Sequence, residues 1–233
     1  PDYLPGRIPP VVNPSSGIAV GLSTNIPPHN LTEVLRACIA LLDRPNMDLE
    51  QLMTYIQGPD FCLGGRIIGI DGIKDYLATG KGRIIVRAEV RIEETPRNRS
   101  LIVTQLPPIG RDKVKASIVK AINARKLEGL MPEMRDESDT EKGTRIVLEL
   151  RKDADAAQAL SQLFNETDLQ IALSFQMVYL FGESMQAARQ PKPVGMIELL
   201  NYWNAHQVDV LTRRAQFDLR KARERLHIVE GLI

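Results

Sequence analysis

Apolar residues recur at three- and four-residue steps over residues 31–42, which predicts an amphipathic helix. Asn30 precedes this run and Glu33 follows three residues later, as in a capping box with Asn in the place of Ser or Thr. The residues expected on the buried face are Leu31, Val34, Leu35, Cys38, Ile39 and Leu42. Shorter helices are predicted over residues 48–56 and 72–77.

Residues 82–94 show the clearest strand pattern, because apolar and mostly charged residues alternate and so give one apolar face. A turn at 96–98 and a second β-rich run at 100–106 predict a hairpin with this strand. The other elements predicted by pattern are strands over 66–70, 129–134, 144–150 and 169–181 and helices over 113–125 and 153–165. This order predicts an α+β fold of two layers, with an antiparallel or mixed sheet and helices on one face.

The last part of the chain has a different pattern. Residues 186–193 are polar and contain prolines, which predicts a linker. Residues 196–233 contain no proline and a single late glycine, so one long helix is predicted. Its apolar residues follow the three-, four- and seven-residue steps of a coiled-coil seam. They are Leu211, Ala215, Ala222, Leu226, Val229 and Ile233.

The composition is that of an ordinary soluble globular protein, with 43% hydrophobic and 25% charged residues. A net charge of +1 gives no global attraction to nucleic acid, so a nucleic-acid surface has to come from local clusters. The two cysteines form no disulfide framework, which suits a reducing cytoplasm, and no apolar run reaches the length of a membrane span. The chain opens on Pro1 and closes within a helical pattern, so we expect a piece of a longer polypeptide. Composition and periodicity alone favour a non-enzymatic, nucleic-acid-binding or dimerising scaffold.

No metal site is predicted from the histidines. His29, His206 and His227 are far apart in the sequence and have no cysteine or carboxylate at ligand spacing. The acidic residues over 136–141 are expected to form a solvated turn between two strands rather than a magnesium site.

A short glycine-rich run, residues 79–83, reads Thr-Gly-Lys-Gly-Arg. It lacks the spacing of a nucleotide-binding loop. The run is therefore either a tight turn into the following strand or a place where Lys81 or Arg83 contacts a DNA phosphate.

Residues 9–30 follow neither a helical nor a strand period. Gly17 and Gly21 permit close approach of the backbone and unusual dihedral angles. Pro27 favours an extended conformation at Ile26 and stiffens the chain that follows. We therefore expect Ile26 to be an apolar side chain on a rigid, non-helical support, which either faces solvent or anchors the loop in the core.

Several runs of residues in this chain form a specific set. In order they are Ser15-Ser16-Gly17-Ile18-Ala19-Val20-Gly21, Asn25-Ile26-Pro27-Pro28-His29-Asn30, Gly58-Pro59-Asp60-Phe61, Thr79-Gly80-Lys81-Gly82, Arg135-Asp136-Glu137-Ser138-Asp139, Thr212-Arg213-Arg214 and Leu219-Arg220-Lys221-Ala222-Arg223. Together they resemble the A subunit of bacterial type IIA DNA topoisomerases, the family of DNA gyrase and topoisomerase IV. The resemblance implies that residues 1–30 are the tail of the DNA-gate region with a DNA-bending loop. It further implies that 31–190 form the α+β tower domain and that 191–233 begin a long coiled-coil helix.

The resemblance also implies a function for the parent protein. Type IIA enzymes break and rejoin both strands of double-stranded DNA and need ATP and Mg²⁺, which act through the B (ATPase) subunit. Two A subunits form a homodimer within an A2B2 heterotetramer in the cytoplasm, away from membranes. The catalytic tyrosine of the family follows an arginine, whereas none of the five tyrosines here does so. We therefore assign no catalytic residue and no cofactor to this chain, and we expect it to be inactive alone.

Site residues are assigned from the same resemblance. The isoleucine of Asn-Ile-Pro-Pro-His, Ile26, is expected to insert between base pairs and bend the DNA, whereas the alternative is a core role for this residue. The residues expected to contact DNA beside it are Ser15, Ser16, Arg7, Lys81, Arg83, Arg213 and Arg214. The basic run over 220–225 slightly favours gyrase over topoisomerase IV.

Overall fold

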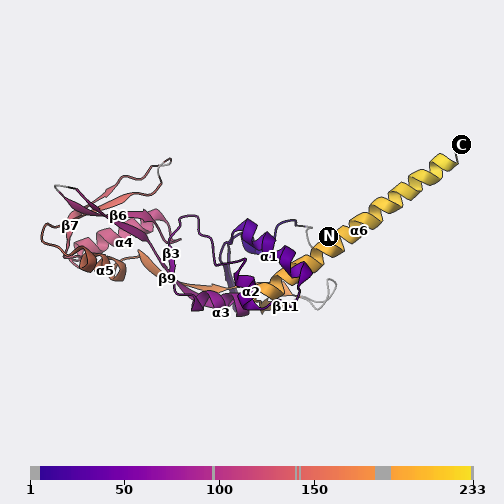
Figure 1. Ribbon diagram of the computed structural model, residues 1–233, viewed down its shortest axis with the longest axis horizontal. Coiled ribbons are helices and arrows are strands. Elements are labelled where there is room, and N and C mark those ends of the chain that lie inside the picture. Colours follow the sequence, from indigo (N-terminus) through magenta and orange to yellow (C-terminus); the bar gives the residue numbers. More distant parts are fainter. Residues whose placement is uncertain (1–5, 96–97, 140, 142, 182–189, 232–233) are drawn as a thin grey trace. The chain divides into compact units, whose positions relative to one another are not determined.

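A computed structural model describes residues 6–95, 98–139, 141, 143–181 and 190–231 of the chain. The chain folds into two compact units (Figure 1). We call them the helical unit, residues 1–58, 76–81 and 176–233, and the sheet unit, residues 59–75 and 82–175. Helices and antiparallel strands occur in both, so the predicted α+β class is confirmed. Residues 31–190, which the resemblance assigns to one tower domain, lie partly in each unit. The domain boundaries that the resemblance implies stay a prediction.

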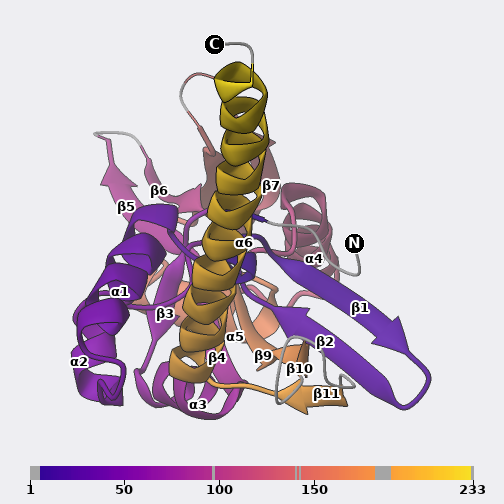
Figure 2. The same cartoon turned by 90° about the vertical axis from the view of Figure 1, so that its right-hand side faces the viewer.

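The helical unit begins with a 3₁₀ turn, η1 (Pro10–Val12), and a β-hairpin (Figure 2). Its strands, β1 (Ser15–Ala19) and β2 (Leu22–Ile26), pair antiparallel with Ala19 opposite Leu22. The prediction that residues 9–30 are neither helix nor strand is therefore wrong. Both faces of the hairpin are largely exposed, so no apolar alternation marks the strands. Gly21, with φ +77°, supplies the left-handed conformation that the tight turn requires.

Helix α1 (Leu31–Asp43) begins at the predicted cap, because the Asn30 side chain accepts hydrogen bonds from the N–H groups of Thr32 and Glu33. Its buried face differs from the prediction. The buried residues are Val34, Ala37, Cys38, Ala40 and Leu41, whereas Leu31, Leu35, Ile39 and Leu42 are exposed. Apolar residues surround much of this helix, so its periodicity permits more than one face, and the choice depends on the partner helix.

The helical unit also contains α2 (Leu49–Met53), which is capped by Asp48, and the second half of α3 (Asp71–Thr79), from Tyr76 onward. Strands β10 (Val178–Phe181) and β11 (Gln190–Pro193) pair antiparallel, with Tyr179 opposite Lys192. Residues 190–193 are therefore a strand and not part of a linker, while 182–189 lie outside the described residues. The prolines of β11 are compatible with a two-stranded ribbon, where a strand needs few ladder donors.

The predicted C-terminal helix is confirmed as α6 (Met196–Glu230). Its first turns pack in the core through Met196, Leu199 and Leu200. The side-chain amide nitrogen of Asn204 donates to the carbonyl oxygen of Cys38, and this hydrogen bond joins α6 to α1. Beyond these turns, the seam residues Leu211, Leu226 and Val229 are exposed.

Two predicted long strands are each divided into two. Residues 82–94 form β4 (Lys81–Arg87) and β5 (Glu89–Glu94), which belong to different sheets. Residues 169–181 form β9 (Gln170–Gln176) and β10. The first strand is interrupted at Ala88, whose N–H donates to the Leu169 carbonyl oxygen at 2.7 Å. The second is interrupted at Met177, whose N–H donates to the Gly80 carbonyl oxygen, also at 2.7 Å.

The further strands of the sheet unit are β3 (Arg66–Ile68), β6 (Arg99–Gln105), β7 (Leu130–Asp136) and β8 (Ile146–Leu150). Strand β3 pairs antiparallel with β4. Strands β5, β6, β8 and β7 form, in this order, a four-stranded antiparallel sheet. Helices α4 (Arg111–Asn123) and α5 (Ala156–Glu166) pack against one face, with Leu101, Leu148, Val114, Ile118 and Leu163 in the shared core. The predicted hairpin of β5 with β6 and the one-sided helical layer are confirmed.

Candidate nucleic-acid interface

The tip of the β1–β2 hairpin exposes apolar side chains. Ile18 is 94% exposed and Val20 is fully exposed at 104%. Ile18 also lines a shallow groove of about 280 Å³ with Leu22, Tyr179 and Leu180. Burying a side chain of this size is worth about 1.5–3 kcal/mol. Apolar tips on a projecting hairpin therefore indicate a surface that meets a partner.

Ile26, at the other end of the hairpin, has the opposite surroundings. It pairs with Ser15 at the base, and it is only 6% exposed. Of the two alternatives for Ile26, the structure shows the buried one, while its expected contact with DNA stays a prediction. Pro27 and His29 turn the chain into the interior directly after β2, and the end of the strand is buried with them.

The base of the hairpin contains a buried polar network. His29 Nδ1 lies 3.0 Å from the carbonyl oxygen of Pro27 and 3.2 Å from that of Val11. His29 Nε2 lies 3.1 Å from the hydroxyl oxygen of Tyr76. His29 is 3% exposed and Tyr76 is 0% exposed. The network joins the chain before β1, the chain after β2 and helix α3.

The two predicted serines lie on the same hairpin. Ser15 and Ser16 are exposed on β1, where they pair with Ile26 and Asn25. Arg7 is exposed in the segment that precedes η1. The structure thus brings both serines and Ile26 onto one element. Sequence reasoning missed Ile18 and Val20 as exposed residues, although a glycine turn between apolar residues is a readable signal of a hairpin tip.

Lys81 and Arg83 lie on β4, next to the buried Ile84, and both are exposed. The turn that leads into them is tight, because the Thr79 hydroxyl accepts from the Lys81 N–H at 3.2 Å. Gly80 has φ +76°, and a Cβ there would lie 2.5 Å from the Val194 carbonyl oxygen. The prediction of a tight turn is confirmed, while the phosphate contacts stay a prediction.

Arg213 and Arg214 are exposed on α6, and each has an acidic neighbour. Arg213 pairs with Asp209, and Arg214 Nε lies 3.9 Å from a carboxylate oxygen of Asp218. These are four-residue helical pairs, which are readable from the sequence. A phosphate at either arginine therefore competes with a carboxylate.

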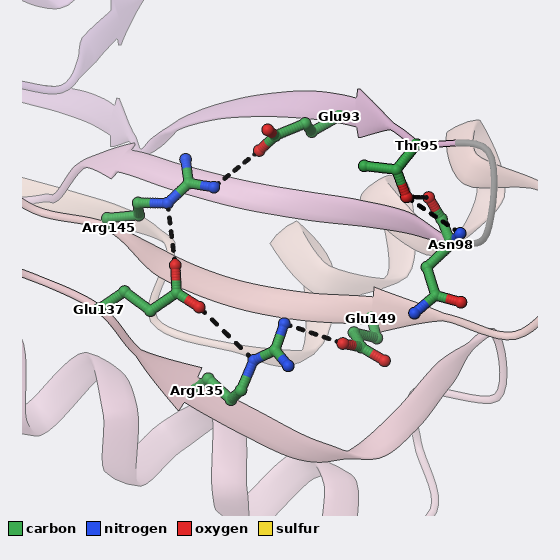
Figure 3. A network of polar contacts seen from close by, with 7 residues as sticks. All are labelled: Glu93, Thr95, Asn98, Arg135, Glu137, Arg145 and Glu149. Atoms are coloured by element: carbon green, nitrogen blue, oxygen red, sulfur yellow. Dashed lines mark hydrogen bonds and ion pairs between the residues drawn. The ribbon is translucent and has the colours of Figure 1, made fainter.

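The acidic turn and its neighbours form a chain of ion pairs on the sheet unit (Figure 3). Arg145 contacts Glu93 at 2.8 Å and Glu137 at 3.1 Å. Arg135 contacts Glu137 at 3.6 Å and Glu149 at 2.9 Å. We call these five residues the ionic chain. Each carboxylate of the ionic chain has an arginine partner. These residues therefore stabilise the surface of the sheet and are not arranged as a site for a cation.

Burial keeps three titratable side chains in their neutral forms. Burial raises the pKa of Cys38 to about 11. Burial, and then the charge of Glu33, raise the pKa of Tyr76 far above its usual range, and burial alone raises that of Tyr179. None of these three groups is prepared to act as an anionic nucleophile near neutral pH.

Neither a metal centre nor a membrane span is present in the described part of the chain. Within residues 6–95, 98–139, 141, 143–181 and 190–231, no group of three or more His, Cys, Asp or Glu residues is arranged to hold a metal ion. Among the same residues, no helix combines the length and the apolar character needed to cross a membrane.

The whole sequence matches a known family. The family model for the A subunit of DNA gyrase/topoisomerase IV matches residues 1–233. This chain belongs to that family. The resemblance predicted from its motifs is therefore confirmed.

Individual members of the gyrase and topoisomerase IV family show the same relationship. The A subunit of DNA topoisomerase 4 from Staphylococcus epidermidis is 41% identical over 241 residues, and that of DNA gyrase from Dehalogenimonas lykanthroporepellens is 42% identical over 240 residues. The A subunit of DNA topoisomerase 4 from Streptococcus pyogenes is 43% identical over 238 residues. Each alignment covers 100% of this chain and 28% of the relative. The gyrase and topoisomerase IV proteins match almost equally well, so the slight preference for gyrase stays a prediction.

Proposed function

We propose that this chain is a DNA-binding segment of the breakage-and-rejoining subunit of an ATP-dependent type IIA topoisomerase, and that its β1–β2 hairpin bends the gate DNA. The observation that carries the proposal is the full exposure of Ile18 and Val20 at the hairpin tip. Proteins that bend DNA insert apolar wedges between base steps, which partly unstacks them. The relatives are named as subunits of DNA gyrase and DNA topoisomerase 4, which supports DNA as the partner.

Ile18 takes the role that the motif resemblance gave to Ile26. A wedge has to leave solvent and enter the base stack without unfolding its support. Ile18 meets this requirement because it is 94% exposed on a paired strand. Ile26 is buried at the hairpin base and supports the hairpin from below.

The proposal also includes contacts with DNA phosphates. Ser15 and Ser16 supply hydroxyl donors on the hairpin, and Arg7, Lys81 and Arg83 supply cations that solvent can reach. Such contacts position a protein on DNA but do not read its sequence. Arg213 and Arg214 contribute less, because Asp209 and Asp218 compete for them.

The chemistry of strand breakage belongs to other parts of the parent enzyme. None of the five tyrosines follows an arginine, as the catalytic tyrosine of the family does, and we propose that this chain alone cleaves no DNA. The parent acts in the cytoplasm as an A2B2 assembly, with ATP and Mg²⁺ acting through the B subunit. A tower role for the α+β part and a coiled-coil role for α6 complete the proposal.

A photocrosslinking experiment tests the contact directly. In the parent A2B2 enzyme mixed with duplex DNA, p-benzoylphenylalanine in place of Ile18 is expected to form a covalent adduct with DNA on irradiation. The matched control carries the same group in place of Ile70, which is an exposed isoleucine outside the hairpin. DNA adducts at position 70 together with none at position 18 would contradict the proposal.

A further inference from the structure

We infer that His29 and Tyr76 are positioning residues: they clamp the base of the β1–β2 hairpin and so set the orientation in which its apolar tip meets DNA. The inference rests on the DNA-bending role proposed above. It assigns a function to a buried network that the wedge itself does not use.

The His29 ring joins the two ends of the hairpin. Val11, whose carbonyl oxygen lies 3.2 Å from His29 Nδ1, precedes β1, and Pro27, whose carbonyl oxygen lies at 3.0 Å, follows β2. The backbone N–H of His29 also donates to the Val12 carbonyl at 3.4 Å. One residue thus holds the entering and the leaving chain together.

The partners determine how the ring is protonated. Carbonyl oxygens only accept hydrogen bonds, so Nδ1 carries the proton that is shared between Val11 and Pro27. In the neutral ring, Nε2 then has a lone pair, which accepts from the Tyr76 hydroxyl at 3.1 Å. Every polar atom of the imidazole is therefore used, and the ring has one orientation in which all three contacts are made.

Tyr76 connects this clamp to a rigid support. It lies on α3, is 0% exposed, and its ring is tilted by 54° against the His29 ring with centroids 5.9 Å apart. His29 thus joins the two ends of the hairpin to each other, and Tyr76 joins them to helix α3. Loss of the Tyr76 hydroxyl alone releases this connection while the ring still fills its space.

The tip depends on the base for its orientation. Ile18 lies three residues beyond Ser15, or about 10 Å along the strand at ~3.3 Å per residue. Asn25 of β2 pairs with Gln176 near the base, and the side chain of the same Gln176 accepts a hydrogen bond at 3.4 Å from the hydroxyl of Ser23, which stands opposite Ile18. A two-stranded hairpin has little stability of its own. A small rotation at the base therefore displaces the wedge from the base step that it enters.

The test uses the parent A2B2 enzyme and compares Tyr76→Phe with Tyr55→Phe, which removes a hydroxyl elsewhere in the helical unit. Three quantities are measured: the melting temperature, amide hydrogen exchange over residues 15–26, and the DNA bend angle by fluorescence energy transfer. For Tyr76→Phe we expect a melting temperature within a few degrees of the parent, at least threefold faster exchange in the hairpin, and a smaller bend. Tyr55→Phe is expected to change none of the three.

His29 is tested with a conservative and a severe variant. The side-chain amide of His29→Asn places a donor near the position of Nδ1, so hairpin exchange and bending are expected to recover partly relative to His29→Ala. If His29→Ala does not fold, Tyr76→Phe and His29→Asn still decide the question. Equal exchange and bending in Tyr76→Phe, His29→Asn and the parent would overturn the clamp. A lower melting temperature without selective change in the hairpin would overturn it too, because it indicates a merely structural role.

Ile18→Ala separates a failure of the clamp from a failure of the proposed function. If Ile18→Ala reduces bending while Tyr76→Phe leaves it unchanged, the positioning role is overturned and the wedge stands. If Tyr76→Phe accelerates hairpin exchange but neither variant reduces bending, the DNA-bending function is overturned, and with it the role of the clamp in DNA bending.

Discussion

Two isoleucines on one hairpin have opposite surroundings. Ile26, at the base, is 6% exposed, and Ile18, near the tip, is 94% exposed. Truncation of the first removes contacts from a packed interior, whereas truncation of the second removes surface that only a partner can cover. The residue type is the same, so position on the hairpin decides which isoleucine supports the fold and which one we propose as the DNA contact.

Two glycines with the same backbone conformation are expected to respond differently to alanine. Gly21 and Gly80 have φ +77° and +76°, but a Cβ meets nothing within 4 Å at Gly21 and lies 2.5 Å from the Val194 carbonyl oxygen at Gly80. Gly21→Ala is expected to lower the free energy of unfolding by about 1–2 kcal/mol, the cost of the left-handed conformation alone. Gly80→Ala is expected to lower it by more, because backbone atoms also have to move.

Urea unfolding of the three variants Gly21→Ala, Gly80→Ala and Gly6→Ala measures these effects. A Cβ at Gly6 also meets nothing within 4 Å, and its φ lies outside the left-handed region, so Gly6→Ala is expected to be neutral. Equal losses for Gly21→Ala and Gly80→Ala would show that the close approach to Val194 has no energetic weight.

At the scale of elements, the four-stranded sheet has two different faces. Leu101 and Leu148 face the helices, and Ile102 and Val147, which pair across β6 and β8, alternate with them and so lie on the other face. Both are only 3% exposed. Arg135 pairs with Val147 in the ladder and belongs to the ionic chain, which therefore lies on the same face. Charged side chains can cover apolar groups with their aliphatic parts while their heads pair in solvent.

The apolar pair is expected to matter more for stability than the ions. Ile102→Ala is expected to lower the free energy of unfolding by about 2–5 kcal/mol, as for other buried isoleucines. Glu137→Gln, which removes the carboxylate shared by Arg135 and Arg145, is expected to cost less than about 1 kcal/mol, because exposed ion pairs are weak. Urea unfolding at low and high salt tests both, with the exposed Glu133→Gln as control. A larger loss for Glu137→Gln than for Ile102→Ala would reverse this ranking.

Asp136, at the end of β7, predicts that the stability of the fold depends on pH. A hydrogen bond from Ser138, together with Lys115 at 3.0 Å, lowers the pKa of Asp136 to about 2 from 3.8. Because the folded pKa lies below the unfolded one, ionised Asp136 contributes stability above about pH 4, and this contribution is lost as the pH falls toward about 2. Asp136→Asn should therefore flatten the fall in unfolding free energy over that range, compared with Asp139→Asn in the same turn. Identical pH profiles for Asp136→Asn and the parent would contradict the assignment.

At the scale of the whole molecule, charge is balanced and function depends on local surfaces. The net charge is +1, and the chain spans about 28% of the length of the curated relatives it matches. Long-range attraction to DNA is therefore expected to be weak, and any contact with phosphates has to come from exposed cations on particular elements.

DNA binding by this chain is expected to be weak, independent of sequence and steeply dependent on salt. Each true phosphate contact contributes about 0.9 to the slope of log affinity against log salt. Lys81→Gln and Arg83→Gln are each expected to reduce the slope by about that amount. Lys126→Gln is the control, because Lys126 is paired with Glu166 at 2.7 Å. Fluorescence anisotropy over a salt series provides the measurement, and an affinity that does not change with salt would contradict the electrostatic account.

Much of the fold was predictable because its pattern is local. The Asn30 cap, the long helix α6 and the β5–β6 hairpin follow from spacing alone, and specific motifs predicted the family. The hairpin of β1 and β2 was not predictable by period, since its exposed faces carry no alternation. The buried face of α1 depends on α6, and the network at the base of the hairpin joins His29 to Tyr76, which lie 47 residues apart. Those features come from tertiary contacts that periodicity does not contain.

The DNA bend angle of Ile18→Ala and Ile26→Ala, measured in the parent enzyme together with the melting temperature of each variant, tests the central claim most directly. Unstacking a base step costs a few kcal/mol, which an inserted wedge helps to offset. Ile18→Ala is therefore expected to reduce the bend angle at an unchanged melting temperature. Ile26→Ala is expected to lower stability by about 2–5 kcal/mol. A normal bend in Ile18→Ala, with reduced bending in a fully stable Ile26→Ala, would contradict the account.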